Sequence, residues 1–250
     1  MRRVAAAALA SLLVTGGCGG SDGDLRVSAA SSLKTALTDY GREQPARFSF
    51  AGSDELAAQI RRGAKPDVFA SANTRLPDEL FREGLAERPV IFAANRLVLA
   101  VPADAGEDAV RSLDDLREPG TAVAVGSESV PVGAYTRTVL SRLPEAQSSG
   151  ILANVRSEEP DVAGIVGKLT QGAVDAGFVY GSDVRGSGGR LRAVELPASL
   201  QPEVAYGVAV AKGTERREQA QAFVDGLLEG PGRRALDAAN FRPPPAPATQ

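Results

Sequence analysis

Hydroxyl side chains and free backbone N–H groups meet at several points in this sequence where a predicted strand runs into a predicted helix. At the first, Ser31 and Ser32 follow an extended run and precede a helical stripe of Leu33, Leu37 and Tyr40. One of the two serines is expected at the helix N-cap, where its oxygen can accept a free N–H and where the helix N-terminus attracts anions. Taken alone, this joint is explained more simply by ordinary capping than by ligand binding.

Three later joints have the same polar character, at residues 52–54, 129–133 and 157–161, and Tyr180 adds a phenol at the end of another predicted strand. Together these groups are rich in hydrogen-bond donors and include no obligatory cation. Such a set can hold a fully ionised oxyanion with neutral dipoles alone. The donors expected at the joints are Ser32, Ser53, Tyr180 and the backbone around Val132 and Val162.

The composition removes most catalytic and metal-binding chemistry. The chain has 250 residues, a net charge of −3, one cysteine and no histidine. A Ser-His-Asp triad is therefore excluded, and one cysteine forms neither an intramolecular disulfide nor a thiolate metal cluster. The acid pairs Asp114–Asp115 and Glu158–Glu159 are explained by the negative charge favoured at a helix start. We expect a binding protein rather than an enzyme, with no cofactor and, given the acidic balance, no nucleic-acid partner.

Predicted strands alternate with predicted helices along the chain, a pattern typical of α/β proteins with mainly parallel sheets. The pattern indicates two lobes, with crossings at residues 95–102 and 204–212. We expect lobe 1 to comprise residues 24–100 and 206–242, and lobe 2 residues 101–205. In α/β sheets ligands collect beyond the carboxyl ends of strands, so two facing lobes would gather the joints around one cleft.

The N-terminus has the features of an export signal. Two arginines precede an apolar run that is too short to span a bilayer comfortably, and small residues lead up to Cys18. This segment resembles the lipobox of bacterial lipoproteins. We expect a signal peptide over residues 1–17, a lipidated Cys18 with a flexible tether over 18–23, and attachment outside the cytoplasmic membrane. The alternative is a plain secretory signal with an incidental cysteine. The proline-rich tail, residues 243–250, is expected to be disordered.

Five short motifs follow one another along the chain: Ala29 to Leu33, Phe50 to Ser53, Pro66 to Ala72, Val130 to Tyr135 and Val179 to Asp183. In this order they resemble the molybdate-binding proteins of bacterial ABC importers. The resemblance runs from about Asp24 to Phe241, which is nearly the whole mature chain. It implies a two-lobed periplasmic-binding-protein fold of type II, with molybdate or tungstate in the cleft between the lobes.

The resemblance also implies which residues bind the anion. In that family two serine hydroxyls, a tyrosine hydroxyl and backbone N–H groups hold it. Carried over, the serines are Ser32 rather than Ser31, and Ser53. The tyrosine is Tyr180, and the backbone donors are Val132 and Val162. Molybdenum would be bound only as molybdate, with no direct metal ligand. The implied partners are an ABC permease and its ATPase, and the protein itself is expected to be a monomer.

Two positions depart from the family pattern. Val132 stands where many relatives have alanine, which keeps the backbone donor but could alter the packing of the cleft. Gly52 stands where a relative can have serine, which removes one possible hydroxyl. Neither change abolishes the set of donors.

Three other functions compete with molybdate binding. A sulfate- or phosphate-type oxyanion-binding protein is the nearest, because the donor set alone does not exclude it. A secreted hydrolase is disfavoured by the missing histidine and the lack of a nucleophile elbow. The effector-sensing domain of a regulator is disfavoured by the export signal and by the lack of a DNA-binding segment.

Overall fold

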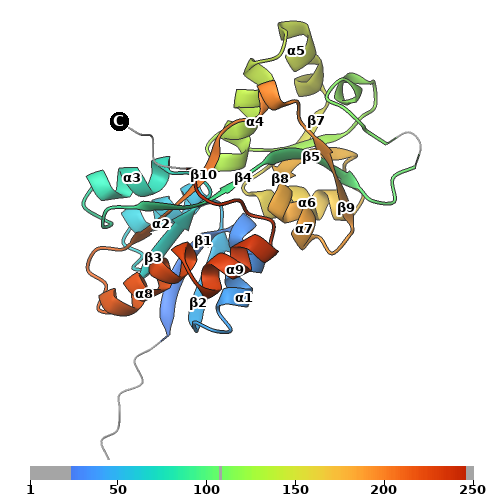
Figure 1. The fold of residues 1–250 in the computed structure, drawn as a ribbon. Helices are drawn as coiled ribbons and strands as arrows, with labels where there is room; N and C mark the ends of the chain where they lie inside the picture. Colours follow the sequence, from blue (N-terminus) through green and yellow to red (C-terminus); the bar gives the residue numbers. More distant parts are fainter. Residues whose placement is uncertain (1–23, 107–108, 246–250) are drawn as a thin grey trace, which may run out of the picture.

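The computed structural model describes residues 24–106 and 109–245, which form two lobes, each built on a five-stranded sheet covered by helices (Figure 1). The first lobe contains the two ends of the described chain, and the second contains its middle. The sheet of the first lobe has the strand order β2-β1-β3-β10-β4. Its strands are β1 Leu25–Ala30, β2 Ala46–Ala51, β3 Val68–Ser71, β4 Val90–Asn95 and β10 Val204–Val210.

Helices cover both faces of the first sheet. Helices α2 and α3 pack on the face that carries Phe69 and Ala209, whereas Val68 and Ala70 point to the opposite face. That opposite face is covered by α1, α8 and α9, whose ribbons lie together at the bottom of Figure 1. The helices are α1 Lys34–Tyr40, α2 Ser53–Arg61, α3 Arg75–Arg82, α8 Arg217–Leu228 and α9 Pro231–Ala238, with a short 3-10 helix η1 at Ser31–Leu33.

The second sheet repeats the arrangement in the order β7-β6-β8-β5-β9. Its strands are β5 Leu97–Pro102, β6 Val123–Gly126, β7 Val155–Glu159, β8 Ala176–Tyr180 and β9 Leu191–Glu195. The helices of this lobe are α4 Pro131–Ser141, α5 Glu145–Ala153, α6 Val162–Thr170 and α7 Gly181–Gly186, with 3-10 helices η2 Asp115–Arg117 and η3 Ala198–Leu200.

Each sheet contains one strand that runs antiparallel to both of its neighbours. In both sheets it is the strand through which the chain enters from the other lobe. In the first sheet β10 is antiparallel to both β3 and β4, and in the second β5 is antiparallel to both β8 and β9. Parallel neighbours require a crossover connection, but β5 and β10 each enter directly from the other lobe. The other four strands of each sheet run in one direction, as expected for a mainly parallel α/β protein.

The chain passes from the first sheet to the second between β4 and β5, and returns just before β10. β5 belongs to the second sheet, so the chain leaves the first lobe at Arg96, and the expected limit at residue 100 falls inside β5. β10 belongs to the first sheet, so the limit expected at residue 205 falls inside β10. Both strands are almost entirely apolar and buried, as strands covered on both faces must be. None of the helices in the part of the chain described by the structure could span a bilayer.

Candidate functional site: a closed cavity between the lobes

The strand–helix joints of the two lobes face one another and line a small cavity. All five residues predicted to bind the anion line it, and all five are buried. Its lining consists of Ala30, Ser31, Ser32, Ala51, Gly52, Ser53, Ala72, Val130, Pro131, Val132, Asp161, Val162 and Tyr180.

Ser32 lies in η1, directly after β1, an inner strand of the first sheet. The expectation that Ser31 or Ser32 caps a helix is wrong, because Ala30 precedes η1 and neither serine makes a capping hydrogen bond. The Ser32 hydroxyl instead lies 3.0 Å from the hydroxyl of Tyr206, which is 174 residues further along the chain. Ser32 is 6% exposed, whereas Ser31 is half-buried. The structure therefore gives the two serines different surroundings within the same cavity wall.

Ser53 is the first residue of α2 and is 1% exposed. Its Oγ accepts a hydrogen bond of 3.1 Å from the backbone N–H of Ala72, which follows β3. Because a hydroxyl oxygen can accept one bond while its proton donates another, Ser53 retains a donor for a ligand. The Ala72 contact also ties the start of α2 to the end of the neighbouring strand.

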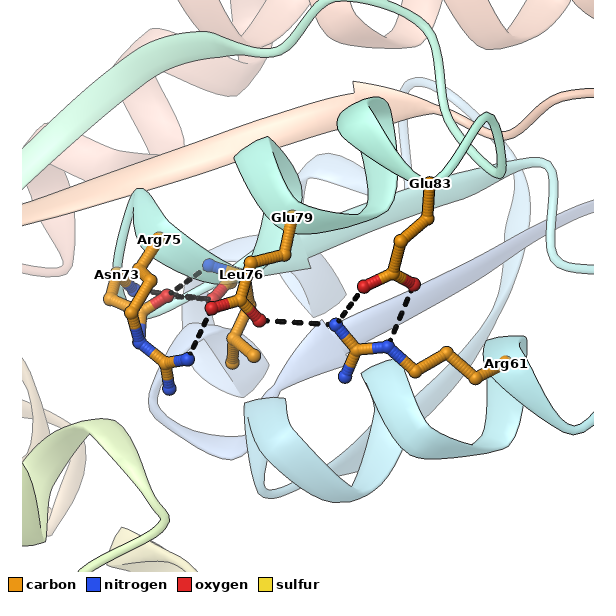
Figure 2. Close-up of polar contacts among 7 residues, drawn as sticks. Arg61, Asn73, Arg75, Leu76, Glu79 and Glu83 are labelled. Carbon is orange, nitrogen blue, oxygen red and sulfur yellow. Dashed lines mark hydrogen bonds and ion pairs between the residues drawn. The ribbon is translucent and has the colours of Figure 1, made fainter.

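The turn around Ala72 is held by a local network of side chains (Figure 2). The Oδ1 atom of Asn73 accepts hydrogen bonds from Ser71 Oγ at 3.0 Å and from the N–H of Leu76 at 3.1 Å, which fixes the entry into α3. Further along α3, Glu79 and Glu83 share the guanidinium of Arg61, the last residue of α2, at 2.8–3.0 Å. The network joins α2 to α3. It therefore fixes the start of α2, which carries Ser53, relative to the turn at Ala72.

The second lobe contributes two helix N-termini. Val132 is the second residue of α4, after Pro131, and Val162 is the first residue of α6. The first N–H groups of a helix have no acceptor inside that helix, so these backbone groups are available to a ligand. Asp161 caps α6, since its Oδ1 accepts from the N–H of Gly164 at 3.0 Å. At the start of α4 the neighbouring Gly133 is required, because a Cβ there would collide with the Ser127 carbonyl oxygen.

Tyr180 ends β8 and is 1% exposed. Its hydroxyl is buried and finds no hydrogen-bond partner among the described residues. Leaving such a group unpaired costs about 1–3 kcal/mol, and the Tyr180 hydroxyl is free to donate to a ligand in the cavity. Burial raises the pKa of the Tyr180 phenol well above 10, and the neighbouring groups Tyr206, Tyr135 and Asp183 act in the same direction. Tyr180 therefore remains a neutral donor at physiological pH.

The cavity can bind an anion without carrying a compensating charge. The described residues that line it include no lysine or arginine, and the ionisable carboxylate among them is Asp161. The hydroxyls of Ser32 and Ser53 are hydrogen-bonded to groups that cannot act as a general base: Ser32 to the Tyr206 hydroxyl, and Ser53 to the backbone N–H of Ala72. Within residues 24–106 and 109–245 no cluster of acids, cysteines or histidines is suited to a metal ion. The serine and tyrosine hydroxyls and the two helix N-termini all present donors, so the arrangement suits an oxyanion.

Sequence reasoning gave no role to four residues that shape this site. Ala72 and Asp161 fix its hydrogen bonds, Tyr206 lies behind Ser32, and Pro160 approaches Gly52 across the cavity. Two of them have a local signal: Tyr206 is a phenol within an otherwise apolar strand, and Asp161 is a preferred N-cap residue before an apolar helix. Ala72 and Pro160 act through backbone atoms, which leave no pattern in the sequence.

Known proteins of similar sequence and fold identify the family of this chain. A family model described as bacterial extracellular solute-binding protein matches residues 25–242. The molybdate-binding protein ModA of Mycobacterium tuberculosis is 38% identical over 226 residues, which cover 87% of this chain and 84% of that protein. Bacillus subtilis YvgL, provisionally named a substrate-binding lipoprotein of an ABC transporter, is 27% identical over 94% of this chain and 95% of its own length.

Among solved structures, the periplasmic molybdate-binding protein of Azotobacter vinelandii superposes with a TM-score of 0.78. The match covers 89% of this chain and 100% of that one, at 21% identity, and so it shows a common fold. The two lobes, the closed cavity and the extent of the family match lead to one conclusion. This chain belongs to the bacterial extracellular solute-binding protein family.

Proposed function

We propose that this protein captures molybdate or tungstate in the cavity between its lobes and delivers it to an ABC permease and its ATPase. The observation that carries the proposal is the buried Tyr180 hydroxyl, which has no hydrogen-bond partner among the described residues and belongs to a residue that lines a cavity of neutral donors. Molybdate at neutral pH is a dianion that presents only acceptors, so the two sets of groups are complementary. The similarity to a protein named as molybdate-binding supports the same anion.

Binding energy would come from hydrogen bonds made by Ser32, Ser53, Tyr180 and the backbone at Val132 and Val162. A hydrogen bond to a charged group contributes roughly 1.5–3 kcal/mol, and exclusion of water between the closed lobes strengthens each bond. The small cavity favours a compact tetrahedral anion over an organic solute. Sulfate has the same charge but is smaller, so discrimination against it would depend on how closely the lobes fit the anion.

Phosphate is the second candidate, and Asp161 is the observation that favours it. Phosphate at neutral pH is partly protonated and needs an acceptor for that proton. The Asp161 carboxylate lines the cavity and uses Oδ1 to accept from Gly164, but a carboxylate has about four lone-pair sites. For molybdate the same carboxylate is an unfavourable neighbour, so the choice between the two anions is a measurable property of this site.

Calorimetric titration of the purified protein with molybdate, tungstate, sulfate and phosphate tests the proposal. We expect molybdate and tungstate to bind with one anion per chain and to compete for the same site. Sulfate and phosphate should bind at least about tenfold more weakly, which corresponds to 1.4 kcal/mol. Preferential binding of phosphate or sulfate, or no binding of molybdate, would refute the assignment.

We further propose that Cys18 is lipidated and holds the protein at the outer face of the cytoplasmic membrane as a monomer. Cys18, the signal peptide at 1–17 and the tether at 18–23 lie outside the described residues, so the support is the lipobox-like sequence and the relative named as a lipoprotein. The monomer is supported by a cavity that one chain completes. Loss of Cys18→Ala from the membrane fraction, and a monomeric mass in sedimentation, are the expected results.

A further inference from the structure

We propose that Tyr206 is a positioning residue that directs the Ser32 hydroxyl at the bound anion and links it to Tyr180 of the opposite lobe. The inference rests on the proposed function, because it concerns how the same cavity achieves its affinity. Tyr206 does not line the cavity and would not touch the anion. It acts through residues that do.

The contact between Ser32 and Tyr206 is buried and specific. Their hydroxyl oxygens are 3.0 Å apart, Tyr206 is fully buried, and Ser32 is 6% exposed. Tyr206 lies in the middle of β10, whose other residues are valine, alanine and glycine. Placing a phenol there is unfavourable unless its hydroxyl finds a partner, so the tyrosine requires an explanation beyond core packing.

The direction of the hydrogen bond decides what Ser32 can do. Either oxygen can be the donor, and an anion that presents only acceptors needs the Ser32 proton for itself. In the bound state Tyr206 must therefore donate to Ser32, and Ser32 must donate to the anion. Hydrogen bonds in such a chain polarise one another, so the Tyr206 hydroxyl strengthens the Ser32 donor as well as orienting it.

The surroundings keep Tyr206 in the state that this role requires. Burial raises the pKa of its phenol well above 10, and the charge of Asp183 acts in the same direction, so the proton is retained. Hydrogen bonding by Ser32 and Asn95 lowers the pKa of the Tyr206 phenol, but this effect is smaller than the rise caused by burial. Asn95 lies at the end of β4, at the crossing to the second lobe, where its Nδ2 donates to Ser182 Oγ at 2.9 Å.

The ring of Tyr206 contacts the other lobe. It meets the ring of Tyr180 edge-on, with centroids 5.8 Å apart, and it packs in the same manner on Phe241 at 5.2 Å and Phe92 at 6.2 Å. Tyr180 comes from β8 of the second sheet, whereas Ser32 follows β1 of the first. Tyr206 therefore contacts one cavity-lining hydroxyl residue from each lobe, Ser32 and Tyr180.

The substitution Tyr206→Phe tests this role because it keeps the ring and removes the hydroxyl. We expect the affinity for the anion that binds tightest to fall about three- to tenfold, as for loss of one orienting hydrogen bond. Tyr40→Phe is the matched control, since the Tyr40 hydroxyl is also buried and donates to the Phe223 carbonyl at 3.1 Å, far from the cavity. That variant should change thermal stability but leave affinity unaltered.

A double-mutant cycle with Ser32→Ala separates positioning from a general structural effect. If Tyr206 acts through Ser32, adding Tyr206→Phe to Ser32→Ala should change affinity by less than about twofold. Fully additive losses, or an unchanged affinity of Tyr206→Phe alone, would overturn the inference while leaving the proposed function intact. A wild-type protein that binds none of the four anions would instead overturn the proposed function and this inference together.

Discussion

Gly52 allows the two lobes to approach closely over the cavity. It precedes α2 in the first lobe, and an ideal Cβ at this position would lie 2.5 Å from the carbonyl oxygen of Pro160 in the second lobe. The backbone of Gly52 has φ −60° and ψ 138°, a conformation open to any residue. The added Cβ would also lie 2.9 Å from Asp54 Oδ1, but that atom ends a side chain that can rotate away, whereas the Pro160 oxygen belongs to the backbone. The glycine is therefore required mainly by the contact between lobes, and Gly52→Ala should act mainly on that contact.

The size of the effect follows from the distance. An ordinary contact for a Cβ begins at 3.4 Å, so the lobes must separate locally by about 0.9 Å to accept the methyl group. Hydrogen bonds from N–H to oxygen span 2.7–3.2 Å, and a shift of this size takes a donor on one lobe out of range. Losing one bond to a charged group, at roughly 1.5–3 kcal/mol, weakens binding about 10- to 150-fold.

Two measurements test this prediction: calorimetry gives the affinity of Gly52→Ala for molybdate, and thermal unfolding without molybdate gives its stability. Affinity should fall at least about tenfold. The unfolding temperature without ligand should stay the same or rise slightly, since alanine at a compatible backbone position stabilises by about 0.4–1 kcal/mol through the unfolded chain. Opposite changes in affinity and stability are the signature of a closure defect.

Gly167→Ala in α6 is the matched control, because no atom lies closer than 4.0 Å to the added methyl group. It should leave affinity unchanged. If Gly52→Ala binds molybdate as tightly as the wild type, or if both alanine variants weaken binding equally, the closed geometry does not determine affinity and the reasoning fails.

Three further predictions concern other residues of the first and second lobes. Tyr180→Phe should weaken molybdate binding about 10- to 150-fold in calorimetry, yet keep or raise the unfolding temperature without ligand, because it removes a buried hydroxyl with no recorded partner; a fall in both would contradict the assigned role. Burial, together with the charge of Asp161, raises the pKa of Asp183 from 3.8 to about 7, despite the N–H bond it accepts from Tyr180. The folded state then binds the extra proton, so stability conferred by this group is present below pH 4 and is lost as the pH rises to 7; Asp183→Asn should flatten this part of the denaturation profile, and an unchanged slope would be evidence against it. Arg61→Ala should lower the free energy of unfolding by about 1 kcal/mol, as expected for a partly exposed ion-pair network, with no change in affinity; a large loss of binding would show that the network does more than join α2 to α3.

The strand–helix joints were predictable because the apolar pattern changes period at each of them. The switch after β1 and the polar break before α2 are local features of the chain. The partner of Ser32 was not predictable. A helix cap is the default for a serine at such a joint, but the hydroxyl turns to Tyr206 once β10 inserts beside β3. That contact exists only after the ends of the described chain have come together in one sheet.

Several elements without a clear local pattern were not predicted, among them β4. β4 and β5 form almost one apolar run, yet they belong to different sheets, because the chain crosses between lobes at Arg96. α7, Gly181–Gly186, has no apolar stripe and is started by the Asp183 carboxylate, which accepts the N–H of Tyr180 at 2.9 Å. α5 and α9 were missed as well. In each case the deciding contacts are tertiary, and the sequence contains no periodicity that reports them.

The cavity as a whole was easier to anticipate than its closure. Residue types alone indicated neutral donors, and the order of the motifs brought them to one site. How tightly the lobes meet depends on Gly52 facing Pro160, on Tyr206 touching Tyr180, and on Asp161 entering the cavity lining. We expect these contacts, rather than the list of donors, to set selectivity among tetrahedral anions.

The most direct test of the central claim is the position of molybdenum in crystals of the protein grown with molybdate, located by anomalous diffraction. We predict a single strong peak within the cavity, with oxyanion oxygens at hydrogen-bond distance from Tyr180 Oη, Ser32 Oγ and Ser53 Oγ. A peak elsewhere on the protein, or an anion in the cavity that leaves the Tyr180 hydroxyl without a partner, would contradict the account.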